Sequence, residues 1–146
     1  MSPTSPMSAT LAGPVSARAK PGEIGAAVLV VEDDEMLGDM LVMLLEAEGY
    51  ATAIARDGES AVTLARRLRP ALITLDLQLP LLTGHGVLRR LAASRLTRRI
   101  PVVVLSSDTG ELVPTSQVKR VLTKPAGVTE LIDTIRGIVP ECRRTA

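Results

Sequence analysis

Three acidic side chains follow an apolar run near the start of the chain. The run Val28-Leu29-Val30-Val31 leads directly into Glu32, Asp33 and Asp34. Adjacent carboxylates repel one another unless they share a cation, and oxygen ligands suit a hard divalent ion. Asp34 has an alternative role, because an aspartate can cap the N-terminus of a following helix. That role leaves Glu32 and Asp33 without a partner, so we expect these two residues to bind a cation.

Three more side chains that could do chemistry each follow an apolar run: Asp76, Ser106 and Lys124. Taken singly, each has an ordinary explanation, as an acceptor for a loop donor, a hydroxyl in a turn and a solvated charge. Together with the first acids they supply carboxylates, a hydroxyl and an ammonium group. A phosphoryl group, bridged to the acids by Mg²⁺ and held by the lysine, would satisfy all of them.

These side chains meet only if the apolar runs are strands of one sheet. The runs lack polar alternation, which is typical of parallel strands that are buried on both faces. We expect five strands, at 26–31, 51–55, 71–75, 101–105 and 121–123. In a parallel sheet the carboxyl ends of the strands share one edge, and ligands bind beyond that edge.

Segments with helical periodicity separate the runs. Apolar residues recur three and four positions apart in four segments, 36–45, 61–68, 87–91 and 131–139. The first stripe includes Met36 and Met40, and Gly49 follows it as a stop signal. Alternation of strand and helix predicts an α/β fold, a doubly wound five-stranded parallel sheet with flanking helices.

Composition limits the remaining possibilities. The chain has 146 residues, 46% hydrophobic and 23% charged, as expected of a globular core. Its net charge of +1 gives no overall attraction to nucleic acid or anionic lipid, and no apolar run approaches the ~20 residues that span a bilayer. We therefore expect no direct nucleic-acid partner and no membrane association. The single cysteine, Cys142, excludes an internal disulfide and an all-cysteine metal site.

The chain divides into three parts by composition. Residues 1–25 are rich in Ser, Pro, Thr, Ala and Gly and lack apolar periodicity, so we expect a disordered leader there. One folded domain is expected over 26–140, and a C-terminal tail over 141–146. Eight arginines lie between positions 66 and 99, and we interpret them as solvated helix faces, with contact to an acidic partner as the alternative. They are Arg66, Arg67, Arg69, Arg89, Arg90, Arg95, Arg98 and Arg99.

The motifs around these side chains have a recognisable order. Glu32-Asp33 follows the first strand, Leu75-Asp76-Leu77-Gln78-Leu79-Pro80 precedes Gly84, Ser106 follows Pro-Val-Val-Val-Leu, and Lys124 precedes Pro125. The intervals are 43 residues from Asp33 to Asp76 and 30 from Asp76 to Ser106. This arrangement resembles the receiver (CheY-like) domain of two-component response regulators, with a flavodoxin-like fold. The resemblance covers residues 26–139.

The resemblance implies a role for each of these residues. Asp76 would accept a phosphoryl group from the phosphohistidine of a sensor histidine kinase or a histidine phosphotransfer protein. Asp33, Asp76 and the backbone carbonyl of Gln78 would bind Mg²⁺, and Glu32 would act through water. The hydroxyl of Ser106 and the ammonium of Lys124 would stabilise the phosphoryl oxygens.

Other families with related chemistry fit less well. Haloacid-dehalogenase-type phosphatases also use an aspartyl phosphate, but they need a second aspartate where Gln78 stands. A dinucleotide-binding fold needs a glycine-rich turn in place of Glu32-Asp33-Asp34. A receiver-like domain that no longer takes phosphate is disfavoured because all the principal site positions are acceptably filled.

The second half departs from the family pattern. Lys124 lies only 18 positions after Ser106, and Pro114 lies between them. We therefore expect the helix that the family has in this interval, its fourth, to be short, distorted or missing. The aromatic residue usual in the family three positions before the lysine is replaced by Val121, and the usual Phe after Lys-Pro by Ala126. These changes predict an atypical output face.

The resulting expectation is a stand-alone cytoplasmic receiver, because no output domain follows the last helix. It would relay a signal to a downstream protein by protein–protein contact and would not be an enzyme beyond self-phosphorylation and self-dephosphorylation. The alternative is a constitutive protein-interaction module with a receiver fold, in which phosphorylation is secondary.

Overall fold

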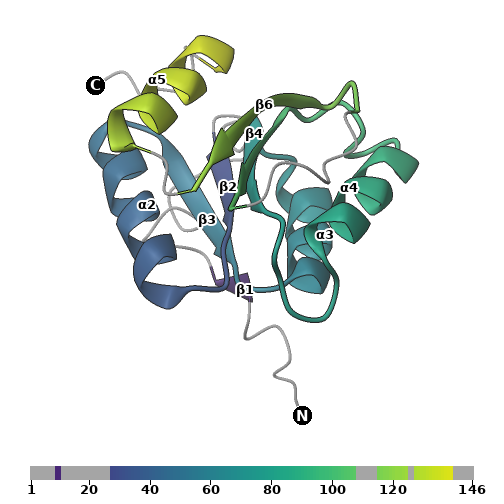
Figure 1. Ribbon diagram of the computed structural model, residues 1–146. Helices are drawn as coiled ribbons and strands as arrows, with labels where there is room; N and C mark the ends of the chain where they lie inside the picture. The colour runs from purple at the N-terminus through teal and green to yellow at the C-terminus, as the bar shows by residue number, and fades with distance from the viewer. Residues whose placement is uncertain (1–8, 11–26, 108–114, 125–126, 140–146) are drawn as a thin grey trace.

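The computed structural model describes residues 9–10, 27–107, 115–124 and 127–139. Strands and helices alternate along most of them, but two pairs of strands follow one another with no described helix between them (Figure 1). The strands are β1 (Ala9–Thr10), β2 (Ala27–Val31), β3 (Ala51–Ala55), β4 (Leu72–Asp76), β5 (Val102–Ser106) and β6 (Val118–Thr123). The helices are α2 (Glu35–Ala47), α3 (Gly58–Leu68), α4 (Gly84–Ala93) and α5 (Val128–Ile138).

The strands form one sheet in the order β1-β3-β2-β4-β5-β6. Strands β2 to β6 are parallel, and only the short β1 runs antiparallel, against β3. From β2 the chain first adds β3 on one side of β2 and then crosses to add β4 on the other side. The order of the strands therefore reverses between β2 and β4, and ligands of such sheets bind beyond the carboxyl ends of the strands at this point. The predicted doubly wound five-stranded parallel sheet is confirmed.

The five predicted strands all occur, and one boundary differs by several residues. Strand β6 begins at Val118, three residues earlier than expected, and its register with β5 shifts between Val102 and Val103. Lys119 and Arg120 are exposed on this edge strand, so its first half lacks the apolar run that marks the other strands.

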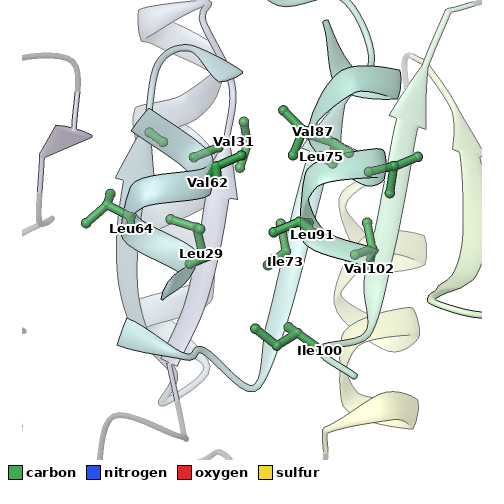
Figure 2. Packing of buried hydrophobic residues seen from close by; sticks show 14 of the residues in the cluster. Leu29, Val31, Val62, Leu64, Ile73, Leu75, Val87, Leu91, Ile100 and Val102 are labelled. Atoms are coloured by element: carbon green, nitrogen blue, oxygen red, sulfur yellow. The ribbon is translucent and has the colours of Figure 1, made fainter. Parts of the chain in front are cut away.

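Helices cover both faces of the sheet, with α2 and α5 on one face and α3 and α4 on the other (Figure 1). Successive residues of each strand face opposite layers, so both sets must be apolar. Figure 2 shows Leu29, Ile73, Leu75 and Val102 packed beneath α3 and α4. The alternate residues, such as Val30, lie in the cluster beneath α2 and α5.

Side chains at the helix N-termini satisfy backbone donors. Asp34 Oδ1 accepts from the N–H of Leu37 at 3.1 Å, which confirms its predicted capping role. Asp57 caps α3 in the same way, through the N–H of Ser60 at 2.7 Å. After α2 the chain reverses at Gly49, whose φ of 98° lies in the region that favours glycine.

The apolar stripe predicted along α2 is wrong at its methionines. Met36 is 83% exposed and Met40 is 43% exposed, whereas Leu41 and Leu45 are buried. Periodicity alone cannot show how wide a face the sheet covers, and here the covered face is narrower than the run of apolar residues.

Several predictions concern residues that the structure leaves undescribed. Within the expected leader, only Ala9 and Thr10 are described, and they pair with Ala55 and Ile54. The predicted C-terminal tail lies outside the described residues. So does the segment 108–114, which is part of the region between Ser106 and Lys124 where we expect the fourth helix of the family to be short, distorted or missing. Its described neighbours, Ser107 and residues 115–117, are not helical. No helix within the described ranges is long and apolar enough to cross a membrane.

Candidate functional site

The predicted acidic residues meet at the carboxyl edge of the sheet. Val31 pairs with Leu75, so Glu32 and Asp76 follow neighbouring positions on β2 and β4. Carboxylate oxygens of Glu32, Asp33 and Asp76 all lie within 4.8 Å of one another. Glu32 and Asp76 are buried and Asp33 is exposed, so the cluster has a buried base and one side open to solvent.

Lys124 reaches this cluster from the end of β6. Its Nζ lies 3.2 Å from Glu32 Oε1 and 3.1 Å from Asp76 Oδ2, which makes it a counter-ion for both buried carboxylates. The backbone N–H of Lys124 donates to the carbonyl oxygen of Ser106 at 2.8 Å. This bond ties the start of the loop after β6 to the end of β5.

Ser106 occupies the last position of β5, next to the acidic cluster. It is buried and pairs with Thr123, and the preceding residue, Leu105, pairs with Asp76. The hydroxyl-bearing residue therefore lies on the strand beside Asp76, between the elements that carry Asp76 and Lys124. The structure thus brings Ser106 to the same edge as the other predicted residues.

The buried carboxylates are oriented by a repeated arrangement. Asp76 Oδ1 accepts from the backbone N–H of Gln78 at 3.0 Å, while Oδ2 faces Lys124. Glu32 Oε2 accepts from the backbone N–H of Asp34 at 3.2 Å, while Oε1 faces Lys124. Each carboxylate therefore has one oxygen on a backbone donor two residues ahead and the other on the ammonium group. Sequence reasoning placed Gln78 here through its carbonyl and missed this N–H contact.

Close backbone packing positions the loop that follows Asp76. A Cβ at Gly84 would lie 2.5 Å from Leu77 Cα and 2.9 Å from the carbonyl oxygen of Asp76. A Cβ at Gly58 would lie 2.1 Å from the carbonyl oxygen of Leu82. Side chains at these positions would force the loop away from α3 and α4, so both glycines are required for its present path.

Arg56 lies next to the site, and the sequence analysis did not predict this position for it. One of its terminal nitrogens, Nη1, lies 3.2 Å from the carbonyl oxygen of Asp34 and 3.4 Å from that of Glu35, and Nη2 lies 2.8 Å from Asp39 Oδ1. A Cβ at Gly38 would lie 2.5 Å from Nη1, so the glycine makes room for the guanidinium group. The sequence offers one indication of this role, because Arg56 is the only basic residue between positions 32 and 57.

Burial and charge shift two ionisable groups of the site. Burial, followed by the charge of Asp76, raises the pKa of Glu32 from 4.5 to about 7, although Lys124 opposes the shift. Burial alone would lower the pKa of Lys124, but its hydrogen bond to Asp76 and the charge of Glu32 outweigh burial and raise it. Lys124 is therefore a permanent cation at neutral pH.

The donor set suits a divalent cation. When Glu32, Asp33 and Asp76 are all ionised, Lys124 neutralises one charge and two remain. The ligand oxygens of octahedral Mg²⁺ lie roughly 3 to 4.2 Å apart. The carboxylate oxygens of this cluster lie within 4.8 Å of one another, so they would need to move only slightly closer together to bind the ion. Hard carboxylate oxygens are also the ligands that Mg²⁺ prefers.

The sequence model of one protein family, the response regulator receiver domain, matches residues 28–136 of the chain. The chain belongs to the response regulator receiver domain family. This receiver domain is similar to the polar-differentiation response regulator DivK of Brucella anthropi, with 34% identity over 75% of the chain and 93% of the relative. It is also similar to the DNA-binding response regulator MtrA of Mycolicibacterium smegmatis, with 44% identity over 82 residues. That match covers 56% of the chain but only 35% of MtrA.

Solved receiver domains share the fold. The receiver domain of the sensor histidine kinase PA1611 from Pseudomonas aeruginosa has a TM-score of 0.72 and 28% identity, over 80% of this chain and 99% of that one. That structure has a magnesium ion coordinated in its active-site cleft. A sensor protein from Polaromonas has a TM-score of 0.71 and 29% identity, over 80% and 97% of the two chains. Receiver domains are signalling phosphoacceptors that bind Mg²⁺ at an acidic site and take phosphoryl groups from histidine kinases.

Proposed function

We propose that this receiver domain accepts a phosphoryl group on Asp76 and relays a signal by protein–protein contact. The donor would be the phosphohistidine of a sensor histidine kinase or of a histidine phosphotransfer protein in the cytoplasm. The observation that carries the proposal is the arrangement of Asp76: its carboxylate is buried, oriented by a backbone N–H and placed 3.1 Å from Lys124. The nucleophile is thus both fixed and kept beside a cation.

In the proposed transfer, an oxygen of the ionised Asp76 attacks the phosphorus atom. A new P–O bond forms while the P–N bond to the donor histidine breaks, and the imidazole leaves with the electron pair of that bond. The donor ring regains a proton from solvent. The step needs no further acid or base from the receiver, so positioning and charge stabilisation account for its chemistry.

The residues that would hold Mg²⁺ are Asp33 and Asp76 through their carboxylates, Gln78 through its carbonyl, and Glu32 through water. Bound there, Mg²⁺ would neutralise charge that otherwise repels the incoming phosphoryl group. Asp33 supports this assignment because it is the exposed member of the cluster and can contact an ion that keeps several waters.

Lys124 and Ser106 would contact the oxygens of the transferred group. Lys124 now contacts two carboxylates, and it can exchange one of them for a phosphoryl oxygen by rotation about its flexible side chain. Ser106 lies on the strand beside Asp76, from where its hydroxyl can donate to a second oxygen. Together they would stabilise the charge that the phosphoryl group brings into the buried site.

The route of output is part of the proposal. The match to 93% of the polar-differentiation response regulator DivK supports a signalling role for this domain. Val121 packs against the apolar cluster on the α3 and α4 face, at the position where the family usually carries an aromatic residue. This observation favours a second candidate, a constitutive interaction module in which phosphorylation is secondary.

Phosphorylation can be tested directly. The purified protein is incubated with acetyl phosphate and Mg²⁺, and its intact mass is measured before and after treatment with hydroxylamine. We expect the added mass of one phosphoryl group, which hydroxylamine removes, in the wild type and none in Asp76→Asn. No added mass in the wild type, or an equal gain in Asp76→Asn, would refute Asp76 as the acceptor. A partner that binds Asp76→Asn as tightly as the phosphorylated wild type would support the constitutive module.

A further inference from the structure

The charge of this chain is divided between the two faces of its sheet. Residues 32–57, which include α2, hold eight acidic residues and one basic residue. Residues 58–107, which include α3 and α4, hold eight arginines, no lysine and two acidic residues. The net charge of +1 is therefore the sum of an acidic region that includes α2 and a basic region that includes α3 and α4, on opposite faces of the sheet.

The eight arginines are all exposed, and we call them the arginine surface. They are Arg66, Arg67, Arg69, Arg89, Arg90, Arg95, Arg98 and Arg99. Within the described ranges, Arg90 alone among them forms an ion pair, with Glu59. Seven guanidinium groups are thus left to repel one another, with no acidic side chain of the described residues to compensate them.

The topology places six of them at the edge of the sheet opposite the acidic site. Arg66 and Arg67 lie in the last turn of α3, and Arg69 follows that helix just before β4. Arg95, Arg98 and Arg99 follow α4, just before β5. Strands β4 and β5 are neighbours, and the N–H of Ile73 donates to the carbonyl oxygen of Pro101 at 3.0 Å. The strands are five residues long, which separates this edge from Asp76 by about 16 Å. A partner bound here would leave the phosphoacceptor site open.

The loop that carries Arg95, Arg98 and Arg99 is held by buried hydrogen bonds. The side chain of Gln117 donates to the carbonyl oxygens of Thr97 at 2.7 Å and Ile100 at 2.9 Å. Thr97 Oγ1 in turn donates to the carbonyl oxygen of Leu91 at 2.7 Å. The backbone beneath the arginines is therefore ordered before a partner arrives, which reduces the entropy lost on binding.

Helix dipoles explain only part of this arrangement. Arg66, Arg67 and Arg90 lie in the last turns of their helices, where a cation is favourable. Arg95, Arg98 and Arg99 lie outside the helices, so the dipoles give no reason for them.

The details of the surface favour a protein partner over a nucleic acid. The pair of Glu59 and Arg90 shows how an arginine of this surface binds a carboxylate, because the two carboxylate oxygens each lie 3.3 Å from a different nitrogen of Arg90. Leu96 is 45% exposed among the arginines, and it offers an apolar contact that a phosphate backbone would leave uncovered. The sole aromatic residue, Tyr50, is buried and cannot stack on bases.

We propose that the arginine surface binds an acidic segment of a partner protein in which an apolar side chain packs on Leu96. This site is separate from the proposed phosphoacceptor site and does not depend on phosphorylation. Carboxylates of the segment would pair with the guanidinium groups as Glu59 pairs with Arg90.

The test uses the full chain and two short fluorescein-labelled peptides, measured by fluorescence anisotropy at about 150 mM salt. Both peptides consist of glutamate and aspartate around two central residues, which are leucines in one and serines in the other. We expect the leucine peptide to bind more tightly than the serine peptide. Arg67→Gln/Arg99→Gln should weaken binding of the leucine peptide by about fivefold or more.

Two controls separate this site from general charge attraction. Met43→Glu/Ala47→Glu changes the net charge by the same amount on exposed positions of α2, and it should leave binding unchanged. Leu96→Ser should weaken the leucine peptide and leave the serine peptide unaffected. The proposal is overturned by an absence of binding, by equal losses in the two double variants, or by indifference to Leu96→Ser. It is likewise overturned if a DNA duplex or phosphatidylserine vesicles bind more tightly than the leucine peptide.

Discussion

The ammonium nitrogen of Lys124 lies 3.1 Å from Oδ2 of Asp76, although 48 residues separate the two along the chain. The same nitrogen contacts Glu32 at 3.2 Å, so one cation holds together the ends of β2, β4 and β6. It occupies the neighbourhood in which a divalent cation and a phosphoryl group would also have to be accommodated. The response of the site to changes at Lys124 is therefore informative.

Replacing Lys124 by Met should affect metal binding and phosphorylation in opposite directions. Loss of the ammonium group removes a competitor for the carboxylates, so the affinity for Mg²⁺ should rise by about threefold to tenfold. Phosphorylation by acetyl phosphate should slow by about tenfold or more, because a cation that stabilises the phosphoryl oxygens is gone. Isothermal titration calorimetry and intact-mass kinetics measure the two effects. Lys119→Met, at an exposed lysine that contacts the carbonyl of Ser116, should change neither.

Stability without divalent cations should fall as the pH rises from about 4.5 to 7. Glu32 has a pKa of about 7 in the folded chain against 4.5 ordinarily, so the folded state keeps a proton that the unfolded state loses. Lys124 has a raised pKa and stays charged in both states across this range, so it contributes no slope. Urea unfolding in EDTA at several pH values measures the effect. Glu32→Gln should flatten the profile, and an unchanged slope in that variant would exclude Glu32 as the source.

Arg56→Met should weaken Mg²⁺ binding by about threefold to tenfold. The guanidinium group contacts the carbonyl oxygens of Asp34 and Glu35, which directly follow Asp33, the exposed member of the proposed metal site. Without these contacts, the first turn of α2 should gain freedom that metal binding would have to remove. Calorimetric titration with Mg²⁺ gives the change in affinity.

Arg90→Met is the matched control for Arg56, because it also removes an arginine–carboxylate pair between two elements, here α3 and α4. Its affinity for Mg²⁺ should equal that of the wild type. Arg56→Lys should recover only part of the lost affinity, since a lysine lacks the forked donors that contact two groups at once. Equal affinities in Arg56→Met and Arg90→Met would show that Arg56 has no positioning role.

Thr74→Val should raise the free energy of unfolding by about 1 kcal/mol. Thr74 is buried between Val30 and Val103, and among the described residues its Oγ1 has no hydrogen-bond partner. Valine has nearly the same shape and removes the unpaired hydroxyl. Thr52→Val is the control with the opposite sign, because the buried Oγ1 of Thr52 donates to Glu46 at 2.8 Å. Chemical denaturation of both variants tests the prediction, which is wrong if both lose stability.

Leu81→Asn should also stabilise the fold, by about 1 kcal/mol. Leu81 has a φ of 70°, which strains its backbone, and its side chain is 81% exposed, so burial does not compensate for the strain. The N–H of Leu82 donates to the carbonyl oxygen of Pro80 at 2.7 Å and closes a tight turn around it. Asparagine tolerates this conformation better than leucine. Leu96→Asn, at an exposed leucine with negative φ, should bring no comparable gain in thermal unfolding.

Local patterns of residue type were sufficient to predict most of the elements and the composition of the site. The run from Val28 to Val31 is apolar at every position because both faces of β2 are covered, and this leaves a mark in the sequence itself. Asp76, Ser106 and Lys124 each follow such a run, and parallel strands end at a common edge. Their meeting therefore follows from the fold class without any knowledge of distances.

Tertiary structure decided the features that depend on contacts between distant segments. Met36 and Leu45 both continue the apolar periodicity of α2, yet only Leu45 is covered, because the sheet reaches one side of the helix. Arg56 contacts the first turn of α2 only because β3 lies beside β2, and the pKa of Glu32 rises because folding buries it next to Asp76. Periodicity and spacing describe one segment at a time, whereas exposure, ion pairing and ionisation depend on what the other segments bring to the same place.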